Sequence, residues 1–434
     1  MKLPANHALR QELNDEVHAR PPPALSASCR ISFLALLSEP KSRTAERAHI
    51  AVLCERFGVV SPVASANHFK AEMLKGQPGA VTLLWERHTE FARYMVIAEG
   101  AGDDPFAKSA LSYLPEDWVA AIPGKLLVAT HIAVLPDTGE PIDPDRLSAQ
   151  YFSGHVLVGA DVGAEAGTAF ADFRILADGF SRLMVWNKSM TPRQSGRTVQ
   201  RLIELDSYRM MTLLALPIAR GLSPFLSQCE RELAEITGRM TDAPVEEEPQ
   251  LLQRLTKLEA EIQSRHADNH FRFSAASAYH DLVERRIAEL REGRLHGVQT
   301  FGEFTERRLV PAVNTCRSVA GQLEGLSERV ARATQSLSTR TAITRERQNQ
   351  ALLETMARRA KMQLRLQQTV EGLSVAAISY YVVGLIGYGA KGFKAVGLPF
   401  EPDLVMALSI PFVIGFLAYG LQRIRGRLKL GSDE

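Results

Sequence analysis

The clearest pattern of hydrophobic and polar positions along this chain is a pair of uncharged runs near its C-terminus. The first run covers residues 372–390 and the second covers residues 404–422. Each has about 19 residues, close to the roughly 20 that a helix needs to cross a bilayer at about 1.5 Å per residue. A buried hairpin of a soluble protein is the alternative, but two consecutive uncharged runs of this length are unusual there. We therefore expect two transmembrane helices joined by an external loop at residues 391–403.

Charges around the two runs predict their orientation. The basic residues before the first run are Arg358, Arg359, Lys361 and Arg365, and those after the second are Arg423, Arg425, Arg427 and Lys429. The loop has only Lys391 and Lys394, offset by Glu401 and Asp403. Because basic flanks are retained on the cytoplasmic side, we expect both termini in the cytoplasm and residues 423–434 as a basic cytoplasmic tail.

The flanking arginines and lysines also suggest a binding partner. Most of the charged residues in the segment 340–365 are basic, with only Glu346 and Glu354 opposing them, and a nucleic-acid patch is one interpretation. The run leads directly into the first apolar segment, however, and anionic lipid headgroups attract basic residues near the membrane surface. We favour the headgroups, and the net charge of +2 gives no global indication of nucleic-acid binding.

At the other end of the chain, residues 1–24 predict a short helix followed by a proline connector. The apolar stripe of the helix is Leu9, Leu13 and Val17, and residues 21–23 are all proline. Glu16, His18 and Arg20 bring together an acid, an imidazole and a guanidinium, so an active site is one interpretation. Cations are also favoured at a helix C-terminus, and we prefer capping and docking roles for these residues.

Residues 25–190 alternate between strand and helix patterns and predict an α+β domain. Buried strands are expected at residues 30–38, 80–88, 91–100 and 125–136, with two or three more between residues 155 and 186. One helix is expected at residues 43–57. Many strands with few helices indicate an α+β arrangement rather than a doubly wound sheet.

Residues 191–371 change to helical spacing and predict a stalk of long antiparallel helices. A helix from residue 195 is broken near Pro217, and residues 240–250 form an acidic linker. The next helix has a short coiled-coil-like seam at Leu251, Leu255, Leu258 and Ile262. A second long helix is expected from about Thr300 towards the membrane, starting again or bending at Pro311, with a further joint near Thr339 and Thr341.

Two histidines are weak candidates for a metal site. His266 and His270 lie four residues apart, so on a helix both rings share one face. Together with Asp268 or His280 they could bind a transition metal, but the H-E-x-x-H pattern is absent and we favour a solvated helix face. The four cysteines are isolated, which argues against a zinc ribbon or a disulfide framework and favours a reducing compartment.

Other motifs with chemical meaning are missing from the sequence. The segment 159–167 is rich in glycine but lacks the patterns of nucleotide-binding loops, so we expect a turn between two strands there. No nucleophile elbow or Cys–His pairing is evident. We therefore expect no enzymatic activity and no cofactor.

Several segments resemble a family of uncharacterised bacterial membrane-anchored proteins. They are LNDEVHARPP, ISFLALLSE, SYRMMTLLALPIAR and SVAAISYYVVGLIGYGAKG. The resemblance covers most of the chain and implies a location in the bacterial inner membrane.

The order of the expected elements is also similar to that of CorA-type magnesium channels. Those channels have a Gly-Met-Asn motif at the outer end of the first span, where this sequence has Tyr388, Gly389, Ala390 and Lys391. A lysine at a pore mouth repels divalent cations, so this likeness implies the architecture more than magnesium transport. Tyr388, Gly389, Lys391, Glu401 and Asp403 are the candidate residues of this loop or mouth.

The sequence thus predicts an oligomeric module at the inner membrane with a structural or regulatory binding role. Two spans alone cannot enclose a pathway, so any transport would also require an oligomer. A CorA-like channel or transporter with altered selectivity, acting on an unidentified ion or small ligand, is the alternative. An enzyme that uses Asp15, Glu16, His18 and Arg20 ranks third.

Overall fold

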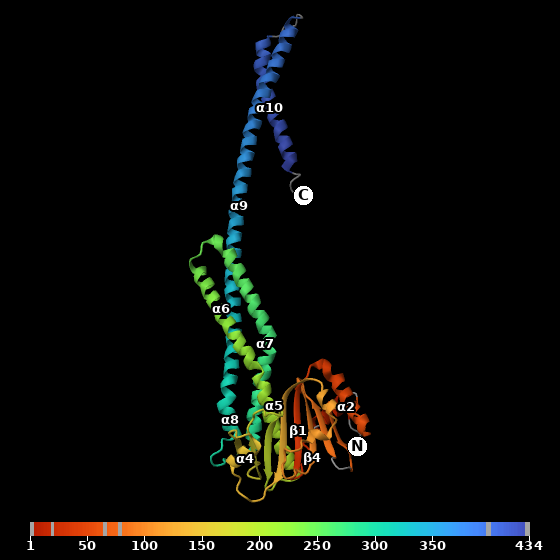
Figure 1. The fold of residues 1–434 in the computed structure, drawn as a ribbon. Coiled ribbons are helices and arrows are strands. Elements are labelled where there is room, and N and C mark those ends of the chain that lie inside the picture. The colour runs from red at the N-terminus through yellow and green to blue at the C-terminus, as the bar shows by residue number, and fades with distance from the viewer. Residues whose placement is uncertain (1–3, 19–20, 64–66, 77–79, 396–400, 430–434) are drawn as a thin grey trace. The chain divides into compact units, whose positions relative to one another are not determined.

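The structure is a computed structural model that describes residues 4–18, 21–63, 67–76, 80–395 and 401–429. The chain divides into two compact units. The first contains residues 1–242 and 250–334, and the second contains residues 243–249 and 335–434. We describe each unit separately (Figure 1).

The first unit is built on one sheet of eight strands in the order β2-β3-β4-β1-β5-β8-β7-β6. The strands are β1 (Cys29–Leu37), β2 (His68–Met73), β3 (Val81–Arg87), β4 (Phe91–Glu99), β5 (Lys125–Pro136), β6 (Val158–Val162), β7 (Gly167–Ala171) and β8 (Ser181–Asn187). Neighbouring strands are antiparallel except β5 and β8, which are parallel. The parallel pair therefore joins two antiparallel halves.

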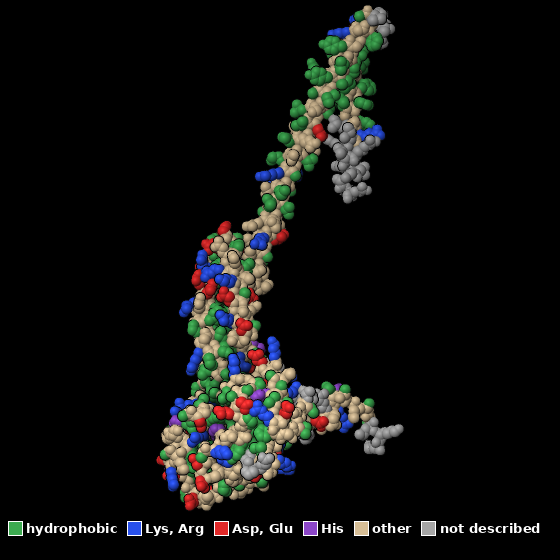
Figure 2. All heavy atoms as spheres, turned by 45° about the vertical axis from the view of Figure 1, so that its right-hand side comes forward, with side chains coloured by type: hydrophobic (Ala, Val, Ile, Leu, Met, Phe, Trp, Pro, Cys, Tyr) green, Lys and Arg blue, Asp and Glu red, His purple; other side chains and the backbone are tan. Residues whose placement is uncertain are grey.

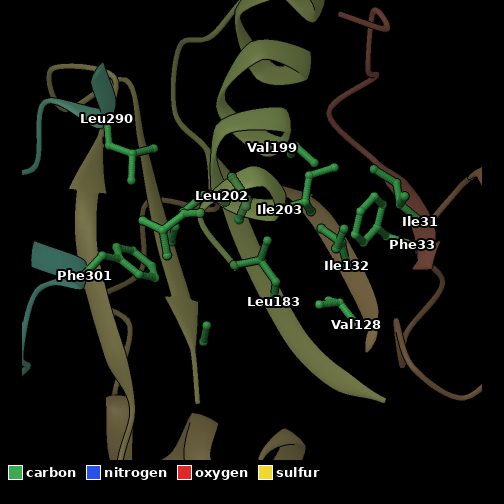
Figure 3. Packing of buried hydrophobic residues seen from close by; sticks show 14 of the residues in the cluster. Ile31, Phe33, Val128, Ile132, Leu183, Val199, Leu202, Ile203, Leu290 and Phe301 are labelled. Carbon is green, nitrogen blue, oxygen red and sulfur yellow. The ribbon is translucent and has the colours of Figure 1, made fainter. Parts of the chain in front are cut away.

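Both faces of the central strands are buried because each is covered by helices. Successive side chains of β1 point to opposite faces, so Ile31 and Phe33 join one core while Leu34 and Leu36 join another. The first core includes Val199, Leu202 and Ile203 of α5 (Pro192–Leu213), and Figure 3 shows these three side chains directed towards the sheet. The second core lies under α2, with Trp118 of α3 also buried in it.

The helices are α1 (Arg10–His18), α2 (Arg43–Phe57), α3 (Glu116–Ala120), α4 (Pro144–Tyr151), α5 (Pro192–Leu213), α6 (Ala215–Asp242), α7 (Glu248–Leu290), α8 (Phe301–Arg308), α9 (Val310–Ala395) and α10 (Pro402–Lys429). Short 3₁₀ turns occupy Pro40–Ser42, Ala110–Tyr113 and Val245–Glu247. In the first unit, α6, α7 and the beginning of α9 lie side by side (Figure 1).

Most of the expected elements are confirmed, with differences at their boundaries. The strands at residues 30–38, 80–88, 91–100 and 125–136 and the helix at 43–57 are present, as is the turn between β6 and β7. The four apolar residues of the expected helical seam, Leu251, Leu255, Leu258 and Ile262, are buried. The first helix breaks at Leu214, before Pro217, and the helix near Thr300 breaks at Leu309 with Pro311 in the first turn of α9.

Two expectations are corrected or extended by the structure. The suggested joint near Thr339 and Thr341 is wrong, because α9 is continuous there and both hydroxyls bond back to carbonyls one turn earlier within the helix. The strand β2 was not predicted. Its Lys70 and Glu72 interrupt the apolar pattern, which an edge strand tolerates because only part of it is buried.

Candidate functional site

Most of the exposed large hydrophobic side chains among the described residues belong to the second unit. Phe412 and Phe416 of α10 are 77% and 79% exposed, and Tyr380 of α9 is 78% exposed. Figure 2 shows hydrophobic side chains covering the ends of α9 and α10, with few charged ones among them. Large apolar side chains rarely remain exposed in such a continuous patch unless a membrane or a partner covers it.

Three helical stretches are long and apolar enough to cross a membrane, judged by length and composition. They are Pro192–Asp242, Phe301–Ala395 and Pro402–Gly420. One third of the most apolar window in the first is buried within the protein, compared with 17% in the second and none in the third. The apolar residues of α5 and α6 thus contribute to the core of the first unit, which explains their hydropathy without a membrane.

The two helices of the second unit approach each other closely near their connection. A side chain at Gly387 would meet Met406 of α10, so glycine allows this contact, whereas Gly384 and Gly389 have open space around them. A groove of about 660 Å³ lies between the helices and is lined by Tyr380, Tyr388, Lys391, Asp403 and Met406, among others. Its lining is mainly apolar. Ser379 is buried, and its hydroxyl has no partner within the described part of the chain.

The candidate residues of the loop or mouth lie at this end of the helix pair. The ammonium group of Lys391 lies 6.0 Å from the centre of the Tyr388 ring. Glu401 pairs with Lys394, with 3.5 Å between carboxylate and ammonium. Gly389 belongs to α9 and Asp403 to α10. These contacts join neighbouring residues of the connection rather than forming a ring of ligands.

The basic residues expected near a membrane surface are exposed where they are described. Arg358, Arg359, Lys361 and Arg365 lie on α9 and Arg423 lies on α10, all with exposed side chains. The side chains of Arg425 and Arg427 lie outside the described residues. The same holds for the side chains of Glu16 and His18, at the end of α1, and for Arg20 as a whole.

His266 and His270 do share one face of α7. Their rings stack with centroids 5.3 Å apart, and both line a cavity of about 400 Å³ between α7 and α9. Cys316, Arg317 and Glu324 line the α9 side of this cavity. Among the described residues, a group close enough to hold a metal ion is formed by His280, Asp281 and Glu284 and does not include His266 or His270. Two of its three members are exposed carboxylates, and Arg317 approaches Asp281 at 3.9 Å.

A buried network of charges on the sheet was not predicted from the sequence. Arg93 of β4 donates to Glu86 of β3 at 2.8 Å and to Glu204 of α5 at 3.1 Å. Arg286 of α7 donates to the other oxygen of Glu204 at 2.5 Å and to Glu289 at 2.9 Å. The network fixes α5 and α7 against the sheet at defined positions.

The carboxylate of Glu204 stays ionised inside this network. Burial by itself would raise its pKa, but Arg93, Gln200 and Arg286 together lower the pKa below its ordinary value. A second buried pair links Glu46 of α2 to Arg87 of β3 at 2.8 Å. Two features of the sequence could have indicated the Arg93–Glu204 network. Glu204 stands within an otherwise apolar helix pattern, and Arg93 stands within an apolar strand pattern.

These features define a protein with an α+β sheet unit followed by long helices, two of which end in exposed apolar surface. The sequence model of one family, described as "Protein of unknown function (DUF3422)", matches residues 5–428. The chain therefore belongs to the DUF3422 family. No curated protein and no solved structure matches it. The expected family resemblance is confirmed, and the likeness to CorA-type channels is unsupported.

Proposed function

We propose that the protein is a membrane-anchored module whose sheet unit faces the cytoplasm of a bacterium. The observation that carries the proposal is the exposed apolar surface of α10 and the end of α9, because none of the most apolar window of α10 is buried within the protein. The two helices would cross the inner membrane as a hairpin, with the connection around residues 391–403 outside. Basic residues precede the first apolar run and follow the second, at the ends of the hairpin away from the connection, and they support this orientation.

The sheet unit supports a binding role rather than transport. Its buried charges are paired, and its cavities are small, at about 400 Å³ for the one lined by His266 and His270. Anionic headgroups would be contacted by Arg358, Lys361 and Arg365, whose exposed side chains lie on the part of α9 that precedes the apolar run. The module would thus present the sheet unit to partners at the membrane surface.

A second copy of the chain is the partner that α9 itself favours. Every side chain from residue 345 to residue 370 is exposed, although an isolated helix is only marginally stable in water. Seven residues in this part recur at alternating spacings of four and three: Leu352, Met356, Arg359, Gln363, Leu366, Val370 and Leu373. Such spacing is typical of a coiled-coil seam, and two copies anchored in one membrane would run parallel.

The anchor is tested with arginines placed on α10 of the full-length protein. Phe412→Arg together with Phe416→Arg should impair insertion, since arginine at a helix centre costs about 2.5–3.5 kcal/mol on insertion scales. Membranes from expressing cells are extracted with alkaline carbonate, and the fraction of protein left in the pellet is measured. We expect the wild type to stay in the pellet and the double variant to be extracted or degraded.

The matched control is Val60→Arg together with Val156→Arg, which places the same charges at exposed apolar positions of the first unit. This control should remain in the pellet. Complete extraction of the wild-type protein by carbonate would contradict the proposed anchor.

A further inference from the structure

A small basic cavity lies where three segments of the first unit meet. It has a volume of about 240 Å³ and lies between the β6–β7 turn at Gly163, the first turns of α5 and the end of α7. Its charged lining consists of Arg197 and Arg201 of α5, Glu289 of α7 and Arg291, which follows α7. Gln194 and Thr198 add neutral polar groups.

The charges of this cavity do not balance. Glu289 accepts from Arg201 at 3.2 Å and also from Arg286 at 2.9 Å, so its single negative charge is shared between two guanidinium groups. Arg197 and Arg291 have exposed side chains and no acidic partner within 4.0 Å among the described residues. Three arginines and one glutamate leave an excess of positive charge, which an anion would compensate.

The backbone around the cavity holds an uncommon conformation. Ala164, Glu165 and Arg291 have φ values of 58°, 65° and 50°, in the left-handed region that costs a non-glycine residue about 1–2 kcal/mol. Two bonds fix these segments to each other: Gly163 N–H donates to the Leu290 carbonyl at 2.8 Å, and Asp161 N–H donates to the Gly293 carbonyl at 3.0 Å. The arginine at the rim is therefore held in place by the surrounding structure rather than by its own conformational preference.

We propose that this cavity binds the phosphate group of a small phosphate monoester. A guanidinium group matches two phosphate oxygens with parallel N–H donors, and two unpaired arginines suit a doubly charged group. The volume admits a phosphate with a short attached chain and is below that of most drug-sized ligand sites. The proposal is independent of the membrane anchor, because all of these residues lie in the first unit.

The test measures binding of glycerol 3-phosphate to the full-length protein in detergent by calorimetry. Arg197→Gln and Arg291→Gly should each weaken binding by about tenfold or more, since each removes a charge-assisted contact. Arg193→Gln is the matched control, because it removes an exposed arginine one turn earlier on the same helix that does not line the cavity. Glycerol 3-phosphate should bind this control as tightly as the wild type.

Arg291→Gly separates binding from folding. Glycine adopts a φ of 50° without strain, so this variant should unfold at the same temperature as the wild type or higher while losing the ligand. A wild-type protein that does not bind glycerol 3-phosphate, or an equal loss of binding in Arg193→Gln, would overturn the proposal. Binding of malonate as tight as that of the phosphate ester would overturn the assignment to phosphate.

Two sources of the same phosphate group are distinguished by a second titration. Inorganic phosphate and a short-chain phosphatidic acid are compared with glycerol 3-phosphate under the same ionic strength. Binding of the soluble phosphates alone supports a soluble metabolite, and tighter binding of phosphatidic acid supports a lipid headgroup. In both cases the Arg197→Gln variant must lose the binding for the site to be this cavity.

Discussion

Glu204 is a carboxylate on the buried side of α5, and its neighbours compensate for its removal from water. Arg93, Gln200 and Arg286 all donate to it, so each of its oxygens has a charged partner. A buried carboxylate that keeps its charge in this way contributes specificity, because the bonds form only when α5 and α7 lie at one position on the sheet.

Glu204→Gln should destabilise the folded state by about 2–4 kcal/mol, since the buried Arg93 and the half-buried Arg286 lose their shared counter-charge. The measurement is the free energy of unfolding in urea. Asp117→Asn is the control, because the Asp117–Arg56 pair is exposed to solvent and its loss should leave the unfolding midpoint unchanged. Equal midpoints for Glu204→Gln and the wild type would show that the network contributes no stability.

His131 makes the stability of the sheet depend on pH. Burial lowers the pKa of His131 from 6.5 to about 4, with a raising effect of Asp178 and a further lowering effect of Arg182. The ring stacks on Phe180 and its Nδ1 lies 2.9 Å from the Ser32 hydroxyl. Between these two pKa values the unfolded chain binds a proton that the folded protein does not, so stability present above pH 6.5 is lost as the pH falls towards 4.

His131→Asn should remove this part of the pH dependence while keeping a polar partner for Ser32. Unfolding midpoints in urea are compared at about pH 7 and about pH 5, because the contribution of His131 to stability changes within this range. We expect the wild type to lose more stability between the two values than the variant does. The same decline in both proteins would assign the acid sensitivity to other groups.

Single residues were the part of the molecule that the sequence predicted least. The adjacent charges of Glu86 and Arg87 resemble an exposed strand end, yet the first pairs with Arg93 and the second with Glu46 in the interior. The partners are separated by 7 and 41 positions along the chain, and only the folded sheet and α2 bring the second pair together. Arg197 and Arg291 are separated by 94 positions, and only tertiary contacts bring them to one cavity.

At the scale of elements, the first turns of α5 illustrate how closely two segments can pack. Thr191 and Gln194 form a capping box that starts the helix, and the Pro192 carbonyl accepts from the Leu25 amide at 2.9 Å. Gly196 is buried at this contact, and a methyl group there would meet the carbonyl oxygen of Pro23. The nearest atoms belong to the backbone of Pro23 rather than to a flexible side chain, so they cannot easily move away from an added methyl group.

Gly196→Ala should therefore destabilise the protein by about 2 kcal/mol or more through overpacking. Gly221→Ala is a control of the same chemistry on α6, where nothing lies within 4 Å, and it should stabilise the helix by about 0.5–1 kcal/mol. Thermal unfolding of the two variants and the wild type provides the comparison. A variant at position 196 as stable as the wild type would mean that the segment before β1 is not held against α5.

Strong apolar patterns explain why many elements were predictable. β1, β3, β4 and β5 have long apolar runs because both faces of the sheet are covered, and α2 was predicted with its observed bounds. The order of strands was not predictable, since the parallel pairing of β5 with β8 joins residues about 50 positions apart. The break between α5 and α6 lies at Leu214, three residues before the Pro217 at which it was predicted. Pro217 stands in the first turn of α6, where a proline is tolerated, so it marks the start of the new helix rather than the break itself.

At the scale of the whole molecule, the proposed second copy along α9 can be tested by cross-linking in membranes. Leu352→Cys would place a thiol on the seam, where two parallel copies bring their side chains together, whereas Glu354→Cys lies on the opposite side of the helix. We expect oxidation to give a disulfide-linked dimer with the first variant and little with the second. The native cysteines are buried, so they should not form the link.

Equal dimer yields from the two variants would mean random collision, and no dimer from either would contradict a parallel pair.

The sequence predicted an oligomer from the number of spans, but the exposed part of α9 became visible only when the structure showed that no helix covers residues 345–370 among those it describes. A ligand-binding role of the sheet unit could not be predicted from the sequence, because the proposed phosphate site at Arg197 and Arg291 combines residues from distant segments.

The composition of the first core has a consequence for synthesis of the chain. Its buried members extend from Leu25 to Val313 and the first unit ends at residue 334, so the whole unit is made before the first apolar run begins at residue 372. At elongation rates of about 20 residues per second, the interval of roughly 40 residues corresponds to about 2 seconds. Assembly of the first core can therefore begin before the hydrophobic helices emerge, and in the proposed membrane-anchored protein this would separate folding in water from delivery to the membrane in time.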